Sequence, residues 1–231
     1  MKVLAIISSS SRSRNTAKLA MQALDGAAVH GAEVEAIVLP EYRLEFCRGC
    51  MTCLRQGRCL LGDDLELIRA KMAEADGIIL ASPTHGMAPN ALMKNLLDRV
   101  GLYSVYTGCL SGKYLAGIAT AGAMGAREAA RQLVQIGGSF YGRSYVTGVL
   151  AAPVGWDAID DHPDWLRRAY DLGARMAEAI AKERTYPFQA CFDRLLTALV
   201  VRQIITRNIL NQKDGVMASV YQYHRERGRF D

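Results

Sequence analysis

The chain of 231 residues contains no apolar run long enough to cross a membrane as a helix, and no internal repeat or low-complexity tract. Its first apolar run, residues 3–7, leads directly into polar residues and is too short for the core of a secretory signal. We therefore expect a cytoplasmic protein without a membrane segment. Dense Lys/Arg tracts are also missing and the net charge is only +5, which argues against a nucleic-acid partner.

Glycine-rich nucleotide motifs are absent as well. Neither GxGxxG nor GxxxxGK[ST] occurs, which disfavours a Rossmann dinucleotide site and a P-loop. What the chain does have is a hydrophobic content of 50% with 22% charged residues, so it can bury a real core and is not expected to be disordered.

Cysteine is concentrated in one short stretch, CRGCMTCLRQGRC, with the spacing C-x2-C-x2-C-x5-C. In an irregular loop, thiols at this spacing can converge on the corners of a four-iron cluster, as a compact cysteine run does in bacterial ferredoxins. Structural zinc sites more often use two C-x2-C pairs with a longer insert, and two disulfides in so short a loop would be strained. We predict iron–sulfur ligands, with zinc or free redox-switching thiols as alternatives; the predicted ligands are Cys47, Cys50, Cys53 and Cys59.

The two remaining cysteines, Cys109 and Cys191, stand alone in the sequence. A free cysteine of this kind is usually a small buried apolar residue, and we interpret both in that way.

Short apolar runs alternate with helical patterns through the first three quarters of the chain. The predicted strands cover residues 2–7, 33–39, 77–81, 113–119 and 145–149. This alternation predicts an α/β fold with a five-stranded parallel sheet and right-handed crossovers, which we assign to residues 1–184. Beyond it, an amphipathic helix over 192–210 indicates a C-terminal helical extension, residues 185–231.

Three loops follow predicted strands at the same edge of that sheet. The first is the polar segment 8–16, which leads into a helix. Backbone N–H groups and the helix dipole converge there on an anion, and Arg12 or Arg14 adds positive charge, so the loop predicts phosphate binding. The alternative is an exposed serine loop with an ordinary N-cap at Asn15 or Thr16. The other two loops, 82–89 and 120–125, lie where open α/β sheets bind ligands.

These features together resemble the iron–sulfur flavoproteins, within the flavodoxin-like NAD(P)H-dependent FMN reductase superfamily. Ser8-Ser9 and Asn15-Thr16 align with the start and end of that family's phosphate loop, Ser82-Pro83-Thr84-His85 with its second loop, and Asp98-Arg99 with the end of the next helix. The cysteine run matches the subgroup that carries a four-iron cluster. Serines replace the glycine, proline and first arginine of the phosphate loop, and His85 stands where tyrosine is usual.

The resemblance implies a flavodoxin-like three-layer sandwich that holds FMN, together with a [4Fe-4S] cluster on the cysteine run. The FMN phosphate would lie on the first loop and the ring on the other two, and no residue is assigned as a catalytic acid or base. The residues implied in cofactor binding are Ser9, Ser11, Arg14, Asn15, Thr16, Pro83, Thr84, His85, Gly86, Thr120, Ala121, Gly122 and Gly125.

The expected function is that of an oxidoreductase passing electrons between the cluster and FMN, to a small-molecule or protein acceptor. NAD(P)H or an acidic, ferredoxin-like protein would be the electron donor, and the working unit would be a homo-oligomer, either a dimer or a tetramer. Two alternatives stay open: an NAD(P)H-dependent FMN or quinone reductase with structural cysteines, and a non-enzymatic zinc-binding or redox-sensing module.

Overall fold

Buried apolar strands form the centre of the fold. In the computed structural model, which describes residues 1–186 and 201–230, five parallel strands lie in the order β2-β1-β3-β5-β8. They are β1 (Lys2–Ile7), β2 (Glu33–Val38), β3 (Gly77–His85), β5 (Tyr114–Ala121) and β8 (Tyr145–Pro153). A two-residue strand, β4 (Ala88–Pro89), pairs antiparallel with the end of β3. The predicted five-stranded parallel sheet is confirmed, and its strand order is that of flavodoxin.

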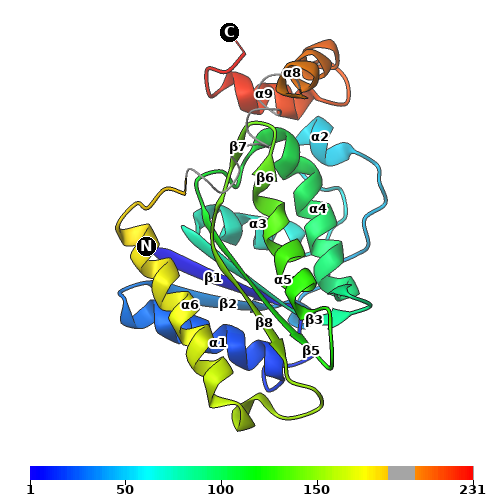
Figure 1. Ribbon diagram of the computed structural model, residues 1–231. Helices are drawn as coiled ribbons and strands as arrows, with labels where there is room; N and C mark the ends of the chain where they lie inside the picture. Colours follow the sequence, from blue (N-terminus) through cyan, green and yellow to red (C-terminus); the bar gives the residue numbers. More distant parts are fainter. Residues whose placement is uncertain (187–200, 231) are drawn as a thin grey trace.

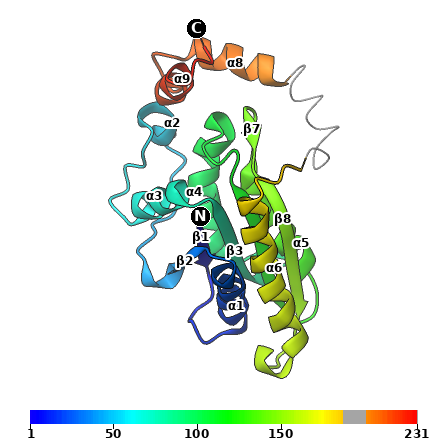
Figure 2. The same ribbon diagram turned by 90° about the vertical axis from the view of Figure 1, so that its left-hand side faces the viewer.

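Helices cover both faces of this sheet (Figures 1 and 2). Alternate residues of β1 point to opposite faces, with Val3, Ala5 and Ile7 in one apolar cluster and Leu4 and Ile6 in the other. The first cluster is completed by α1 (Asn15–Val29) and α6 (Pro163–Ala181), and the second by α3 (Leu65–Glu74), α4 (Ala91–Thr107) and α5 (Ala126–Val134). The result is the expected three-layer sandwich.

Helices α1 and α6 lie side by side with their backbones in contact. A Cβ atom built on Gly173 would lie 1.7 Å from the Ala23 carbonyl oxygen, and one on Gly26 would lie 2.0 Å from the Tyr170 carbonyl oxygen. Only glycine permits such an approach. The crossing therefore sets the position of α1, and with it the position of the loop that precedes α1.

The structure also contains elements that the sequence pattern does not predict. A short helix, α2 (Thr52–Gln56), lies within the cysteine run, and a hairpin of β6 (Gly138–Ser139) and β7 (Gly142–Arg143) precedes β8. Strand β3 continues past Ala81 to His85.

The extra helices beyond the sandwich are α8 (Arg202–Asn211) and α9 (Ala218–Arg225). They pack on α2, on α4 and on the β6–β7 hairpin of their own chain (Figure 2). Residues 192–200 of the predicted helix, and Cys191, lie outside the described residues. None of the described helices has the length and apolar character needed to cross a membrane.

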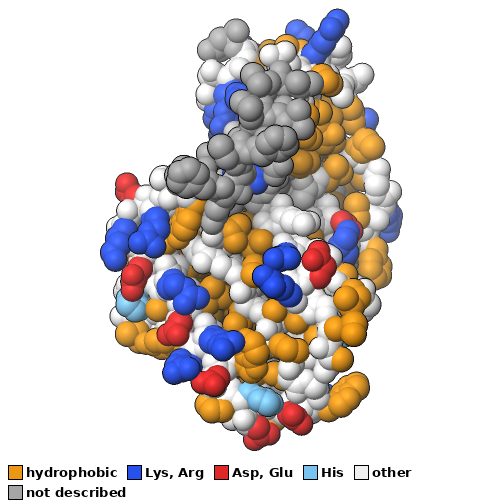
Figure 3. Space-filling view, viewed as in Figure 1, with side chains coloured by type: hydrophobic (Ala, Val, Ile, Leu, Met, Phe, Trp, Pro, Cys, Tyr) orange, Lys and Arg blue, Asp and Glu red, His pale blue; other side chains and the backbone are white. Residues whose placement is uncertain are grey.

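Charged side chains on the face shown in Figure 3 are mixed in sign, with Lys and Arg interspersed among acidic side chains. This distribution agrees with the modest net charge of +5.

Two glycine substitutions should have opposite effects on stability. Gly173→Ala places a methyl group against the Ala23 carbonyl, so we expect the free energy of unfolding to fall by about 3 kcal/mol or more. Gly101→Ala in α4 meets no atom within 4 Å, so it should raise the free energy of unfolding by about 0.5–1 kcal/mol. Urea unfolding measures both; similar values for the two variants would contradict the backbone contact.

Candidate functional site

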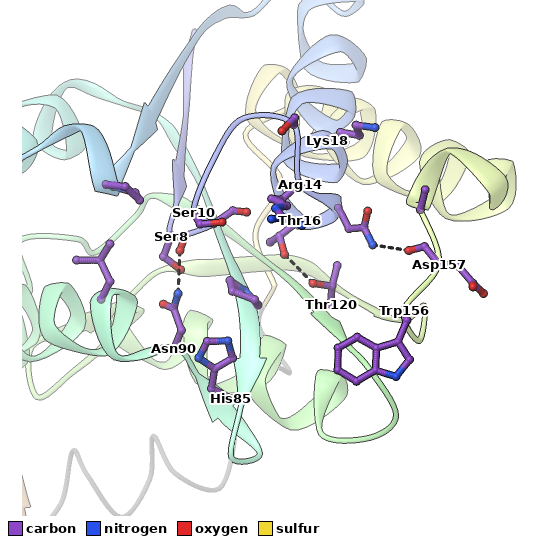
Figure 4. Close-up of a pocket in the computed structure, with 17 residues that line it drawn as sticks. Ser8, Ser10, Arg14, Thr16, Lys18, His85, Asn90, Thr120, Trp156 and Asp157 are labelled. Carbon is purple, nitrogen blue, oxygen red and sulfur yellow. Dashed lines mark hydrogen bonds between the residues drawn. The ribbon is translucent and has the colours of Figure 1, made fainter.

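A cavity of about 770 Å³ lies at the sheet edge where the parallel strands end. The loops after β1 and β8, the end of β3 and Thr120 of β5 all contribute to its lining. Figure 4 shows the first loop and the start of α1 on one side, and the rings of His85 and Trp156 on the other. Its volume is in the range of small-molecule and cofactor sites, roughly 300–1,000 Å³.

The N-terminus of α1 opens onto this cavity. Its N-cap residue, Arg14, has an extended backbone and makes no capping hydrogen bond through its side chain. The first amide groups of α1 are therefore left without a side-chain cap, which is the arrangement that binds anions. Arg14 and Lys18 line the cavity, whereas Arg12 donates from Nε and Nη2 to Glu41 at 2.9 and 2.7 Å and is not among the lining residues.

Hydrogen bonds join the loops around the cavity. The hydroxyl groups of Thr16 and Thr120 lie 2.6 Å apart, and both residues are buried (Figure 4). Asn15 donates from Nδ2 to the Asp157 carbonyl at 2.8 Å, and its Oδ1 accepts from the Ile159 amide at 3.0 Å. Both polar atoms of the Asn15 side chain thus hold the loop after β8 against α1. Asn15 shapes the cavity through these two bonds.

The second loop is tied to the first by Asn90, the N-cap of α4. Its Nδ2 donates to the Ser8 carbonyl at 2.8 Å, while its Oδ1 accepts from the Met93 amide at 3.1 Å. One side chain therefore both caps α4 and fixes the start of the first loop.

Gly125 packs closely against the second loop. It has a φ of +88°, and a Cβ atom there would lie 2.9 Å from Met87 Sδ and 3.1 Å from Thr84 Cγ2. Met87 itself has a φ of +68°, an uncommon value for a residue with a side chain. Gly125 is thus required for the packing of the turn between β3 and β4.

The structure divides the predicted cofactor residues into two sets. Those that line the cavity are Ser9, Arg14, Asn15, Thr16, Pro83, His85 and Thr120. Those that do not are Ser11, Thr84, Gly86, Ala121, Gly122 and Gly125. For both sets, cofactor contact stays a prediction.

Sequence reasoning missed the loop after β8. Trp156, Asp157 and Ala158 line the cavity, and Trp156 is fully exposed. The available signal was the parallel sheet itself, because the carboxyl end of β8 must lie at the same edge as those of β1, β3 and β5.

The four clustered cysteines surround a second, smaller cavity of about 230 Å³. All four are free thiols, and they share the lining with Arg99 and Leu102 of α4. Among residues 1–186 and 201–230, no three His, Cys, Asp or Glu side chains converge as a single metal ion requires.

Left-handed backbone conformations let the chain wrap around this cavity. Gly49, Met51 and Gly57 have φ values of +63°, +54° and +75°. Met51 and Gly57 are the N-cap and C-cap residues of the short helix α2, which contains Cys53.

Hydrogen bonds and burial differ among the four thiols. The Thr52 hydroxyl donates to Cys50 Sγ at 3.3 Å and lowers the pKa of that exposed thiol. Burial raises the pKa of Cys53, which is half-buried beside the C-terminal helices. Arg99 donates from Nη2 to Cys59 Sγ at 3.2 Å. The cysteine loop thus has one exposed edge and one edge enclosed by other elements.

Arg99 joins the cysteine loop to α4. Its guanidinium pairs with Asp63 through both Nη1 and Nη2, and the two side chains are 1% and 0% exposed. Nη1 also donates to the Glu45 carbonyl at 2.9 Å. Burial alone would raise the pKa of Asp63, but hydrogen bonds from Arg99 and from the Glu45 and Leu65 amides together lower it. Sequence analysis identified Asp98-Arg99 only as a match to the family pattern. The structure shows that Arg99 contacts both Cys59 and Asp63.

Comparison with known proteins gives consistent results. A family model described as NADPH-dependent FMN reductase matches residues 1–157. Two curated proteins from Archaeoglobus fulgidus, both named iron-sulfur flavoprotein, are similar to the chain: one is 28% identical over 234 residues, 99% of each chain, and the other is 30% identical over 192 residues, 77% of this chain and 94% of its own. The solved NAD(P)H:quinone oxidoreductase from Methanothermobacter marburgensis has a TM-score of 0.61 at 18% identity, covering 76% of this chain and 96% of that one, and shows likeness of fold.

Removing the charge of Arg99 should strongly destabilise the chain. Arg99→Met leaves the Asp63 carboxylate buried without its partner, and we expect the free energy of unfolding to fall by about 3–5 kcal/mol. The control is Lys94→Met on the same helix, which breaks an exposed pair with Asp98 and should cost about 0.5 kcal/mol or less. Chemical denaturation measures the free energy of unfolding of both variants. An equal decrease in the two would show that the buried pair contributes no more to stability than the exposed pair.

Proposed function

The chain belongs to the NADPH-dependent FMN reductase family and, within it, to the iron–sulfur flavoproteins, so it is a flavin-dependent oxidoreductase; we propose that it passes electrons between a [4Fe-4S] cluster on the cysteine loop and FMN in the larger cavity. One observation carries the proposal. The four cysteines of residues 47–59, spread over thirteen positions of sequence, all line one cavity in the folded chain.

The chemistry of the larger cavity fits a flavin mononucleotide. An uncapped helix N-terminus, the guanidinium of Arg14 and the hydroxyl groups of the first loop suit a phosphate monoester, whereas the ammonium group of Lys18 pairs with Asp160. The rings of His85 and Trp156 on the far side suit a planar ring system. When bound, FMN would exchange one or two electrons and the cluster one, which couples a one-electron donor to a two-electron acceptor.

The donor set of the smaller cavity fits an iron–sulfur cluster. Thiolate is the usual ligand of such clusters, and hydrogen bonds to the sulfur atoms are a lever on their potential. Thr52 and Arg99 supply such bonds to Cys50 and Cys59. Arg99 lies in the wall of this cavity and pairs there with Asp63.

The proposal extends to partners. Arg48, Arg55 and Arg58 are all exposed around the cysteines, which suits an acidic, ferredoxin-like electron donor; NAD(P)H is the alternative donor. The two cavities have no lining residue in common, so we also propose that the working unit is a homo-oligomer, a dimer or a tetramer, in which the loop of one subunit serves the flavin of another.

Each of the four cysteines should be needed for iron. Serine variants of Cys47, Cys50, Cys53 and Cys59, purified without oxygen, should each show lowered iron and sulfide and a loss of broad visible absorption beside the flavin bands. The matched control is Cys109→Ser, because Cys109 is a free, partly buried thiol outside the cavity lining. Full iron content in all four variants would refute the cluster, and zinc in the wild-type protein would support the metal-binding alternative.

Arg14 should strengthen the binding of FMN through the phosphate group and not through the flavin ring. Arg14→Gln removes a charged donor from the phosphate side of the cavity, worth about 1.5–3 kcal/mol, which corresponds to a roughly 10- to 150-fold weaker affinity for FMN. Affinity for riboflavin, which has no phosphate, should be unchanged. Arg12→Gln is the control, since Arg12 pairs with Glu41. Titrations monitored by flavin fluorescence test this; an equal loss for FMN and riboflavin would place the phosphate elsewhere.

A further inference from the structure

Helices α8 and α9 pack directly on the cysteine loop. Leu54 of α2 is 1% exposed and lies in one apolar cluster with Ile209, Met217 and Val220, and Cys53 is packed against the same cluster. The cluster thus joins two segments that are about 160 residues apart in sequence. A loop with one buried leucine would not hold its shape alone, because so little apolar surface offsets the entropy of ordering it.

The contact at Gly57 is close enough to restrict both partners. A Cβ atom on Gly57 would lie 2.6 Å from Ser219 Oγ, on α9. The Gly57 carbonyl accepts from Arg69 Nη1 at 3.1 Å, and that guanidinium lies over the Tyr103 ring at 5.0 Å. The chain segment that leads from α2 to Cys59 is therefore held between α9, α3 and α4.

The C-terminal helices are in turn anchored on the sandwich and not only on the loop. His224 is completely buried, and its Nε2 lies 2.9 Å from the Tyr106 carbonyl of α4, the geometry in which a ring N–H donates. The hydroxyl of Tyr141, in the β6–β7 hairpin, lies 2.9 Å from Thr206 Oγ1 of α8. Phe230 stacks on Tyr221 and contacts the rings of Tyr141 and His224. These contacts give the extension a firm base from which it can position the loop.

From this placement we infer that α8 and α9 act as a clamp on the cysteine loop, with Ser219 and Val220 as positioning residues that hold the four thiols around their cavity. The inference rests on the proposed function in that the group held there is an iron–sulfur cluster. Because the clamp and the cluster favour the same loop conformation, each must strengthen the other by the same factor. The extension thereby becomes part of the metal centre without contributing a ligand to it.

The experiment compares two aspartates on the same helix of the full-length protein. Val220→Asp buries a charge under α9 and should release the helix, whereas Gln222→Asp introduces the same side chain at an exposed position. Supporting contacts around a metal site are typically worth about 10- to 100-fold in metal affinity, so Val220→Asp should lose iron to a chelator about tenfold faster or more. Gln222→Asp should match the wild type.

Amide hydrogen exchange provides a second measurement, which does not depend on iron. In Val220→Asp, amides of residues 47–59 and 218–225 should exchange faster, while those of β1 and β3 stay protected. Leu54→Ala tests the reverse direction and should speed exchange in 218–225. Undocking of α9 in Val220→Asp, with iron retention and protection of 47–59 unchanged, would overturn the clamp. A wild-type protein without iron would refute the proposed cluster instead, and the exchange data would still decide the clamp.

Discussion

The guanidinium of Arg99 is almost completely withdrawn from water, and three chain segments meet on it. From its position on α4, this guanidinium donates to the Asp63 carboxylate, the Glu45 carbonyl and the Cys59 sulfur. A buried ion pair adds little net stability compared with apolar side chains of the same volume, but the loss of one partner is costly. The pair therefore acts chiefly as a constraint, because it fixes Glu45 and Asp63, on either side of the cysteine loop, relative to α4. Lysine could not replace it, because only the planar fork of arginine reaches these acceptors together.

Helix α4 links every functional part of the molecule. Its N-cap, Asn90, holds the first loop of the larger cavity through the Ser8 carbonyl. Arg99, farther along the helix, holds the cysteine loop. Tyr103 and Tyr106, near its C-terminal end, contact α9 through Ser219 and His224. The order of these residues along one helix sets the order in space of the larger cavity, the cysteine loop and the C-terminal helices.

Much of this architecture was predictable because it depends on local patterns. Apolar runs such as residues 2–7 and 77–81 predict buried parallel strands, and the rule that such strands end at one edge predicts that Ser9, Pro83 and Thr120 line one cavity. The Cys spacing predicts that the four cysteines lie together, and they line one cavity; a cluster held there stays a prediction. Other roles depend on partners far away in sequence, which no local pattern reveals. Asn15 bonds to a carbonyl 142 residues away, Gly125 is required by the Met87 turn, and Arg99 pairs with Asp63. Proline inside a run usually indicates the end of a central strand. Strand β3 nevertheless continues through Pro83, because its pairing with β5 and β4 extends to these residues.

The rigidity of α4 bears on how the two proposed centres would exchange electrons. Asn90 and Arg99 are nine positions apart along the helix, and at a rise of about 1.5 Å per position they are separated by roughly 14 Å. The anchor points of the two cavities are thus held apart within one chain, and Figures 1 and 2 show α2 toward the end that carries α9, away from the start of α1. A stiff helix with fixed contacts at both sites cannot shorten this separation by bending. In the homo-oligomer proposed above, a second copy of the chain would instead bring its exposed cysteine edge toward the mouth of the larger cavity. Under that proposal, the assembly of subunits would set the distance between the two proposed centres.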